Sequence, residues 1–562
     1  MAEPRRDCER EGRLAQEASG RGIVRFRIDG RDAVAPAGST ILEAAGAQGI
    51  SIPTLCHHPA LGPCGSCRVC LVEVRPSADL VPACSTAVTE GLECWTDSEA
   101  VARARADRIE LLLANHPLDC PVCDRSGDCR LQDLAFAYGR DAAPGGEPRR
   151  TGEPRALGER LAFRPERCVL CLRCVRFAEE VSGTPALYVD GSREPPRVEV
   201  APGSALDDEL WGNLLDLCPV GAIADAETAA AIPAWLVERR ATICTECARG
   251  CAIEAQVFRG RVVRIAARAN PAVNGFWICD RGRRATDPVG GRKRRVAPSS
   301  LATALGEAPA SALAAGLERF VRARGPEALA GLASSFATLE ELFLFRRIFE
   351  ALAAPRANIA AIERPPGKEA RFPGGFWISS DRNPNRAGVE AILGPECLGD
   401  GRLAAIARGV EEGAIRGLFV LDGRPRAPFG CAPLEERILA KAGALEFFAI
   451  FELTESPATE RALAFPATTP FEKEGTAVAR GGVLQRIRRC AEPPAGVRPE
   501  TEILEEALAA LGARAIVAGP EGVFREVAAE LGHADWEWDR PGRLGPAEPG
   551  AALAEDGHGA ER

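Results

Sequence analysis

The sequence predicts a multidomain protein in which α+β modules precede a larger α/β domain. Its 562 residues are too many for one hydrophobic core to organise. Eighteen of the 21 cysteines lie before residue 281, and fifteen of these form four groups, one of which also includes a histidine. Beyond them, strand-like stretches alternate with helical ones, which indicates a parallel sheet covered by helices.

Composition narrows the class of protein and the kinds of partner. The chain is 46% apolar and 27% charged, with a net charge of -9, so a nucleic-acid partner is not expected. The first residues contain no apolar signal sequence, and no later stretch is apolar for the length of a membrane span. We therefore expect metal ligation rather than disulfides, and membrane contact only through partners.

The first module begins near Gly20 with strand, turn and strand. Apolar residues alternate from Val24 to Ile28 before Asp29-Gly30, a dipeptide typical of a tight hairpin turn. A short helix is expected at about residues 39–49, where a hydroxyl residue precedes apolar positions and glycines follow. This order of elements resembles a β-grasp ferredoxin.

Four cysteines follow with the spacing C-x10-C-x2-C-x13-C, namely Cys56, Cys67, Cys70 and Cys84. Four thiolates can hold a two-iron cluster, and the close pair before LVEV resembles plant-type ferredoxins, although the first gap is longer here. Gly65 would let the backbone approach the cluster closely. Zinc is the alternative, but zinc sites usually contain two short pairs. We interpret Cys64 as a neighbouring thiol that is not a ligand.

A helix is expected from Ser98 to about Asn115, where apolar residues recur with helical spacing. It leads into a compact loop that contains one histidine and three cysteines. These four residues could hold either one zinc ion or one four-iron cluster, and their spacing does not decide between the two. They are His116, Cys120, Cys123 and Cys129.

The third set favours iron. Cys168, Cys171 and Cys174 form a C-x2-C-x2-C run, and Cys218 follows before a proline. In two-cluster bacterial ferredoxins the fourth cysteine of such a run binds the other cluster. Here all four positions of one cluster lack cysteine, and all four of the other retain it. We infer a two-cluster module that has kept one four-iron cluster. The residues at the lost positions are Ala178, Asp208, Trp211 and Leu214.

The fourth set has the spacing C-x2-C-x3-C-x27-C and consists of Cys244, Cys247, Cys251 and Cys279. A short β-rich stretch lies between its third and fourth members. This arrangement indicates another four-iron cluster, with zinc as the alternative.

The order of these four sets resembles the large iron–sulfur subunit, or G subunit, of the bacterial NADH:quinone oxidoreductases of respiratory complex I. The resemblance covers residues 20 to about 290. It implies a 2Fe-2S cluster in the first module, and a 4Fe-4S cluster held by the nitrogen of His116 and three thiolates in the second. With the remaining two sets, it implies one 2Fe-2S and three 4Fe-4S clusters in all.

The same resemblance implies an electron-transfer role at the cytoplasmic face of the bacterial inner membrane. Electrons from NADH, captured by FMN on a partner subunit, would pass through the clusters toward the quinone-side hydrophilic subunits. The fourth cluster is expected to lie off this path and to act as a staple. No Walker sequence occurs, and none of the Gly-x-Gly triplets, at residues 20–22, 399–401 and 557–559, continues as Gly-x-Gly-x-x-Gly. Neither an NADH nor a quinone site is therefore expected on this chain.

Beyond the fourth set the chain resembles the molybdopterin oxidoreductases. Strand-like ALAGLAS precedes a helix start in which Thr338 and Glu341 have capping-box spacing, and IRGLFVLDG and LEFFAIFEL are further expected strands. No cysteine between Asp280 and Glu396 could bind molybdenum. We therefore expect a scaffold without molybdenum, in which three cysteines are structural: Cys397, Cys431 and Cys490.

These interpretations divide the chain as follows: disordered tail 1–19, 2Fe-2S domain 20–97, His/Cys3 4Fe-4S domain 98–140, linker 141–163, 4Fe-4S ferredoxin-like module 164–232, molybdopterin-type 4Fe-4S domain 237–295, α/β domain 296–545 and disordered tail 546–562. The linker is expected because its sequence is rich in glycine and proline.

Three alternatives remain open at this point: the catalytic subunit of an NAD-linked formate dehydrogenase, the electron-transfer subunit of an NAD-reducing hydrogenase, and a zinc-stapled scaffold. The basic stretch at residues 281–295 is likewise either a solvated linker or a docking site for an acidic partner.

Overall fold

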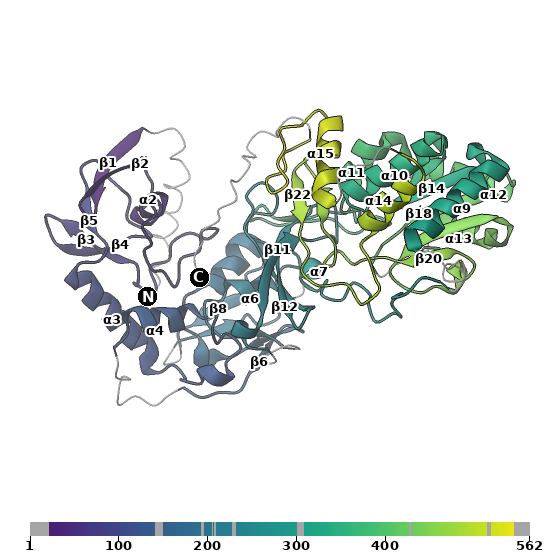
Figure 1. Cartoon of the computed structure of the whole chain (residues 1–562). Helices are drawn as coiled ribbons and strands as arrows, with labels where there is room; N and C mark the ends of the chain where they lie inside the picture. Colours follow the sequence, from purple (N-terminus) through teal and green to yellow (C-terminus); the bar gives the residue numbers. More distant parts are fainter. Residues whose placement is uncertain are drawn as a thin grey trace. The chain divides into compact units, whose positions relative to one another are not determined.

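The computed structural model describes residues 22–140, 150–192, 196–204, 206, 209–226, 232–299, 308–425, 429–430, 432–513 and 519–544 (Figure 1). The expected disordered tails lie outside these residues, as do Asp208 and Cys431. The chain forms two compact units. We call residues up to Val237, together with Phe372–Gly375, the N-terminal unit, and the remainder the C-terminal unit.

The N-terminal unit starts with the expected β-grasp module. Asp29 and Gly30 both have positive φ, 50° and 76°, as a tight hairpin turn requires. The helix that follows begins with a capping box in which the side chains of Thr40 and Glu43 accept from each other's backbone N–H. The sheet order is β2-β1-β5-β3-β4. Its elements are β1 (Ile23–Ile28), β2 (Arg31–Pro36), α2 (Ile41–Ala47), β3 (Leu71–Arg75), β4 (Asp79–Pro82) and β5 (Glu93–Trp95).

Short helices and small sheets form the rest of this unit. The helix predicted from residue 98 is confirmed as α3 (Glu99–Ala114), with Ser98 as its N-cap. Strands pair as a β10-β7-β6 sheet and a β8-β9 hairpin. The elements are η1 (Cys120–Val122), α4 (Arg130–Tyr138), β6 (Arg155–Leu157), β7 (Leu161–Phe163), η2 (Pro165–Arg167), α5 (Arg173–Arg176), η3 (Phe177–Ser182), β8 (Leu187–Asp190), β9 (Arg197–Val200), α6 (Asn213–Leu217), β10 (Ile223–Asp225) and η4 (Ala234–Leu236).

The structure differs from the expected linker at residues 141–163. Its second half contains β6 and β7, and β7 pairs with β10 from the far end of the ferredoxin-like module. The two strands were not predicted because each has only three residues, too few to show an alternation of apolar and polar side chains. The glycines and prolines around them instead indicated a linker. The first half, residues 141–149, lies outside the described residues.

The C-terminal unit opens with an antiparallel sheet and continues as a parallel α/β domain. The antiparallel sheet comprises β11 (Glu238–Ile243), β12 (Ala252–Phe258) and β13 (Arg261–Ala267), followed by α7 (Asp280–Arg283). The parallel sheet has the order β15-β14-β18-β19-β20, with β14 (Leu329–Ser334), β15 (Ile359–Ile362), β18 (Gly417–Leu421), β19 (Phe447–Glu452) and β20 (Leu463–Pro466). All its neighbouring strands are parallel, which confirms the predicted α/β arrangement.

Helices cover both faces of the parallel sheet. Strand side chains alternate, so that Leu329 and Ala333 pack with α9, α10, α14 and α15, whereas Ala330 and Leu332 pack with α12 and α13. The helices and the remaining strands are α9 (Pro309–Arg324), α10 (Leu339–Ala351), α11 (Arg386–Leu393), α12 (Asp400–Glu411), α13 (Pro433–Ala440), α14 (Glu500–Ala510), α15 (Pro520–Glu530), β16 (Ala370–Arg371), β17 (Trp377–Ile378), β21 (Gly475–Val478) and β22 (Leu484–Ile487).

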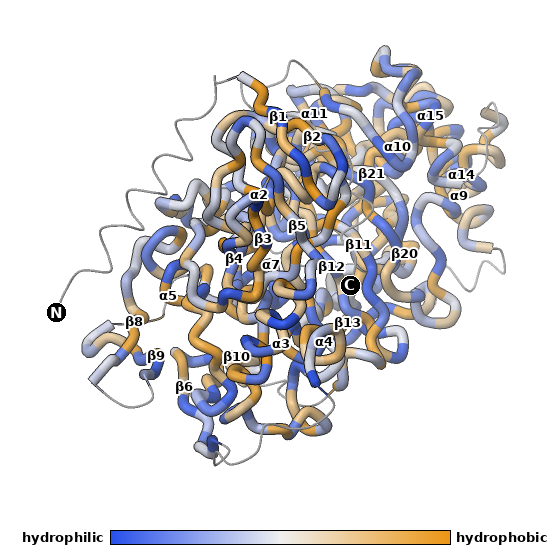
Figure 2. The backbone as a smooth tube through the Cα atoms, turned by 90° about the vertical axis from the view of Figure 1, so that its left-hand side faces the viewer, coloured by the Kyte–Doolittle hydropathy of each residue, from blue (hydrophilic) through white to orange (hydrophobic). Residues whose placement is uncertain are grey.

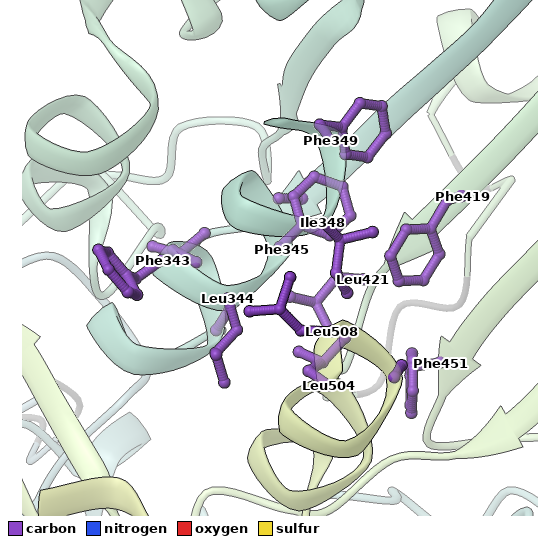
Figure 3. Packing of buried hydrophobic residues seen from close by; sticks show 14 of the residues in the cluster. Phe343, Leu344, Phe345, Ile348, Phe349, Phe419, Leu421, Phe451, Leu504 and Leu508 are labelled. Atoms are coloured by element: carbon purple, nitrogen blue, oxygen red, sulfur yellow. The ribbon is translucent and has the colours of Figure 1, made fainter. Parts of the chain in front are cut away.

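Aromatic side chains fill the core between α10 and the sheet. Phe345 of α10 lies 4.9 Å, between ring centroids, from Phe419 of β18, and Phe451 of β19 packs on the other side of Phe419. Figure 3 shows these rings together with Leu504 and Leu508 of α14. Burial of such large apolar side chains contributes about 1.5–3 kcal/mol each to folding.

Hydrophilic and hydrophobic residues are interspersed along the backbone (Figure 2). Within the described residues, no helix is both long enough and apolar enough to cross a bilayer.

Buried charges occupy the carboxyl ends of the parallel strands. Lys473 Nζ donates to Glu341 Oε1 and Oε2 at 2.9 and 3.1 Å and to Glu500 Oε1 at 3.2 Å. Burial raises the pKa of Glu341 to about 7, although Lys473 opposes the shift. A second group joins Asp422, Arg424 and Glu435. In this strand order, ligands commonly bind at these strand ends, between the first and third strands. Here the chain's own side chains are buried there.

Replacement of Lys473 by methionine should destabilise the C-terminal unit. The change leaves Glu341 and Glu500 buried without a counter-charge, at a cost of about 3–5 kcal/mol. The urea midpoint of the full chain, followed by circular dichroism, should fall accordingly. Lys368→Met, at an exposed position, is the control and should change stability by less than about 0.5 kcal/mol. Equal effects of the two variants would contradict this interpretation.

Candidate metal centres

The first ligand set consists of two pairs of thiols on the β-grasp module. Cys56, Cys67 and Cys70 lie in the loop between α2 and β3, and Cys84 follows β4. Hydrogen bonds join the side chain of Cys56 to those of Cys64 and Cys67, and the side chain of Cys70 to that of Cys84. All four thiols are buried. In a two-iron cluster each iron takes two protein ligands, so this pairing fits the predicted group.

The second set surrounds a short turn between α3 and α4. His116 comes two residues after α3, Cys120 begins η1, and the Cys123 N–H donates to the Cys120 carbonyl at 3.1 Å. Cys129 directly precedes α4 as its N-cap. Burial raises the pKa of the Cys129 thiol to about 11, so this ligand must lose a proton when it binds metal.

The third set depends on an unusual backbone. Leu170 and Leu172, which alternate with the cysteines of the C-x2-C-x2-C run, have φ of 51° and 59°, a left-handed conformation that is uncommon for leucine. The Leu170 N–H donates to Cys168 Sγ at 3.4 Å, the type of hydrogen bond that adjusts cluster potential. Burial raises the pKa of Cys168 to about 11 and, most strongly, that of Cys174.

Apolar side chains fill the place where the sequence predicts a lost cluster. Ala178, Trp211 and Leu214 are all buried, and the Trp211 ring lies 6.2 Å, between centroids, from the edge-on ring of Phe177. Three of the four positions at which the sequence predicts lost ligands are thus buried in the described part of the chain.

Contacts through the loops join the third set to both the first and the second. Toward the first set, Ser66 Oγ donates to the Leu170 carbonyl at 2.8 Å, and Cys64 Sγ to the Cys171 carbonyl at 3.6 Å. Toward the second set, Arg125 Nη2 donates to the Cys218 carbonyl at 3.0 Å. A side chain at position 221 would overlap Cys123 Sγ, so the glycine there is required by this close approach.

The fourth set lies in the C-terminal unit, at one end of the β11-β12-β13 sheet. The Cys244 N–H donates to the Cys251 carbonyl at 2.8 Å, and Cys279 is the N-cap of α7. A Cβ on Gly282 would lie 2.9 Å from Cys244 Sγ and 3.9 Å from Cys279 Sγ, so both sulfurs border one small space. All four cysteines of this set, including Cys247, are buried.

The loop of the fourth set is joined to the α/β domain by backbone contacts. The Ala248 N–H donates to the Asp381 carbonyl at 3.0 Å, and the Ala248 carbonyl accepts from Arg480 N–H at 2.7 Å. Gln485 Nε2 donates to the Gly250 carbonyl at 2.5 Å. This set therefore lies where three parts of the C-terminal unit meet.

Among the described residues, no three His, Cys, Asp or Glu side chains converge as ligands of a single metal ion do.

Two buried arginines belong to these sites and were missed from the sequence. Arg173 lies two residues after Cys171, and Arg249 lies two residues after Cys247. Both side chains are buried, and neither pairs with a carboxylate among the residues that the structure describes. The only signal in the sequence was that each arginine lies two residues after a predicted cysteine ligand. The sequence alone does not show that these side chains are buried.

The last three residues of the basic stretch at 281–295 form ion pairs within the chain. This end of the stretch is therefore neither a solvated linker nor a docking site for an acidic partner. Arg294 forms two ionic hydrogen bonds with Glu472, at 2.5 and 2.6 Å, and Arg295 pairs with Glu452 at 2.7 Å. Lys293 pairs with Glu455 at 2.6 Å. Its acidic partners lie within the chain itself.

The other cysteines vary in environment. Cys64 is half-buried beside the first set, and Cys94 is fully buried in the β-grasp core. Cys397 and Cys490 are buried in the C-terminal unit, where each donates to a backbone carbonyl, of Leu393 and Arg488 respectively.

Known families match the chain in four consecutive segments. Residues 22–99 match the 2Fe-2S iron-sulfur cluster binding domain, and residues 105–144 the NADH-ubiquinone oxidoreductase-G iron-sulfur binding region. Residues 158–224 match the ferredoxin-like domain of NADH-quinone oxidoreductase subunit 3, and residues 238–290 the molybdopterin oxidoreductase Fe4S4 domain.

Curated relatives agree with these segments. The NADH-ubiquinone oxidoreductase 75 kDa subunit of Reclinomonas americana is 37% identical over 46% of this chain and 38% of its own length. The G subunit of NADH-quinone oxidoreductase from Rickettsia felis is 31% identical over 60% of this chain and 50% of its own. The NADPH-Fe(3+) oxidoreductase subunit alpha of Geobacter sulfurreducens is 32% identical over 58% and 39%.

The chain thus spans half or less of the length of these relatives. The resemblance predicted from the cysteine spacings is confirmed: over residues 22–290 this chain matches four iron–sulfur domain models in consecutive order, two of them named for NADH-quinone or NADH-ubiquinone oxidoreductase, and it is similar to the large iron–sulfur subunits of these enzymes.

Proposed function

We propose that this chain is an electron-transfer subunit of an NADH:quinone oxidoreductase and relays electrons from a partner's FMN toward quinone. The observation that carries the proposal is the continuous contact between the first three ligand sets through Ser66, Cys64 and Arg125. When bound, the clusters supply single-electron transfer. The protein's own residues hold the ligands in place, exclude water and adjust potentials by hydrogen bonds and charge.

The sixteen predicted ligands, one 2Fe-2S cluster and three 4Fe-4S clusters remain part of this proposal. The spatial order of the ligand sets suggests a path that enters at Cys56 and its neighbours, passes the Cys168 set and leaves at the His116 set. This path does not follow the order of the sets in the sequence. No acid, base or nucleophile on this chain is needed, and we propose no NADH or quinone site on it.

Exposed apolar side chains support a partner at the second set. Leu118 and Val122, on either side of Cys120, are 52% and 67% exposed. We propose that a quinone-side hydrophilic subunit covers them, because apolar anchors beside a redox group suit docking of the next carrier. The FMN-bearing subunit would dock near the first set, and the complex would lie at the cytoplasmic face of the bacterial inner membrane, where proton translocation belongs to partner subunits.

We propose a structural role for residues 296–545 and for the fourth cluster. The buried ion groups of Lys473 and Arg424 lie at the strand ends where a cofactor would otherwise bind, which suits a scaffold without molybdenum. The fourth set ties β11 and β12 to the α/β domain through Ala248 and Gly250. We also retain the domain limits from the sequence, except that the ferredoxin-like module includes β6 and β7.

The proposal is tested first by iron and molybdenum analysis of the chain purified without oxygen. About 14 iron atoms per chain and no molybdenum are expected. Stoichiometric molybdenum would favour a formate dehydrogenase, and zinc without iron would favour a scaffold. Assay of the intact complex with NADH and a quinone distinguishes the proposed activity from the NADPH-Fe(3+) oxidoreductase activity named for the Geobacter relative.

Replacement of Cys171 by alanine should remove one four-iron cluster and interrupt electron transfer. About four iron atoms per chain and one paramagnetic resonance signal should be lost, and NADH:quinone turnover in the complex should fall to background. Cys94→Ala, at a buried thiol outside the ligand sets, should keep both the iron and the turnover. Normal turnover of the Cys171 variant with its signal absent would refute the relay.

Replacement of Cys247 by alanine should act on stability more than on turnover. Loss of the fourth cluster removes the group that joins the β11-β12-β13 sheet to the α/β domain, so the thermal midpoint of the complex should fall. Turnover measured below that midpoint should stay within about twofold. A loss of turnover as complete as that of the Cys171 variant would instead place the fourth cluster on the electron path.

A further inference from the structure

Arg173 touches the backbone beside two different ligand sets. Its Nη2 donates to the carbonyl of His57, the residue after Cys56, at 2.5 Å. Its Nη1 donates to the carbonyl of Leu217, the residue before Cys218, at 3.1 Å. Arg173 itself lies between Cys171 and Cys174. One guanidinium therefore lies against the first and the third ligand sets at once.

The charge of Arg173 has no acidic partner on the described part of the chain. The side chain is 7% exposed, and Nε has no hydrogen-bond partner. A buried cation without a counter-charge is costly, because burial removes its hydration. Iron–sulfur clusters bound by thiolates carry net negative charge, which becomes more negative on reduction. The bound groups themselves are thus the counter-charge that this arginine fits.

Arg249 repeats this arrangement beside the fourth set. It is 7% exposed, and its Nη1 donates to the Trp377 carbonyl at 2.9 Å. The guanidinium carbon lies 4.5 Å from the ring centroids of both Phe376 and Trp377, so aromatic faces surround the charge. Its Nε also has no hydrogen-bond partner. Two units with different folds therefore place a buried arginine two residues after a predicted ligand.

We propose that Arg173 is an electrostatic tuning residue that raises the reduction potentials of the first- and third-set clusters together, and that Arg249 does the same for the fourth alone. This inference rests on the proposed function. In each reduction the oxidised cluster gains one electron, supplied in the experiment by dithionite. A nearby fixed positive charge stabilises the more negative, reduced form. Because the one guanidinium lies beside both sets, both potentials shift in the same direction.

The test compares Arg173→Gln, which keeps a hydrogen-bond donor without charge, with Arg173→Lys, which keeps the charge. The full chain is purified without oxygen and titrated with dithionite while paramagnetic resonance follows each cluster. At the wild-type midpoint, the ratio of reduced to oxidised first- and third-set clusters should fall about tenfold in the Gln variant, a shift of about 59 mV for one electron. The Lys variant should show a smaller fall, and the fourth cluster should not change.

Arg249→Gln is the matched control and should lower the potential of the fourth cluster only. Assembled clusters with unchanged potentials in Arg173→Gln would overturn the inference and leave the proposed function intact, whereas a wild-type chain without iron would refute the proposed function itself. Equal shifts in the Gln and Lys variants would also overturn it, because loss of contacts rather than of charge would then be responsible. If neither Arg173 variant assembles its clusters, Arg249→Gln decides the case: a lowered fourth potential supports the inference, and an unchanged one overturns it.

Discussion

The structure depends on thiol groups being held in pairs and fours inside a protein interior that disfavours thiolates. Burial raises the pKa of Cys168 and Cys251, and the hydrogen bond with Cys70, together with burial, raises the pKa of Cys84, so these side chains favour the protonated form. A metal bound by them would have to displace the proton. Short elements fix the sulfurs: an N-cap position for Cys129 and Cys279, a hairpin end for Cys84, and left-handed leucines within the third run. None of these elements is long enough to be stable alone, so packing between the loops has to hold them.

Packing between the loops also decides which ligand sets are neighbours. Cys64 and Ser66 join the first set to the third, and Arg125 joins the third to the second. Ala178, Trp211 and Leu214, at positions where the sequence predicts lost ligands, are buried and contribute to the hydrophobic core of the ferredoxin-like module. In the C-terminal unit, by contrast, the buried polar groups are ion pairs: Lys473 and Arg424 each pair with buried carboxylates of the same unit.

Local features of the sequence predicted the local features of the fold. The Asp29-Gly30 turn, the α3 helix and the capping box of Thr338 depend on neighbouring residues, and each forms where the pattern indicates. The alternating strands of the α/β domain were recognisable because buried parallel strands are almost wholly apolar. The iron–sulfur domains were recognisable because the spacing of cysteines is a chemical signal in itself, and the individual ligands remain predictions.

Long-range features were not predictable in the same way. The hydrogen bond from Ser66 to the Leu170 carbonyl joins residues that are 104 positions apart, and neither residue type predicts it. The burial of Arg173 depends on carbonyl groups of His57 and Leu217, which belong to two other loops. Strands β6 and β7 are too short to show an alternation of apolar and polar residues. They form a sheet because β7 pairs with β10, which lies far along the chain. Arrangement in space, rather than residue type, carries this information.

The contact of Gly221 with Cys123 has a consequence for biosynthesis. The surroundings of the second set are complete only after the ribosome has added almost a hundred further residues, because Gly221 and Arg167 form part of them. Metal loaded onto the nascent His116 loop would meet an open, hydrated site that oxygen could reach. Insertion of the cluster that we propose for this set should therefore follow translation of the whole ferredoxin-like module, so that the cell's cluster-delivery machinery would act on a folded N-terminal unit.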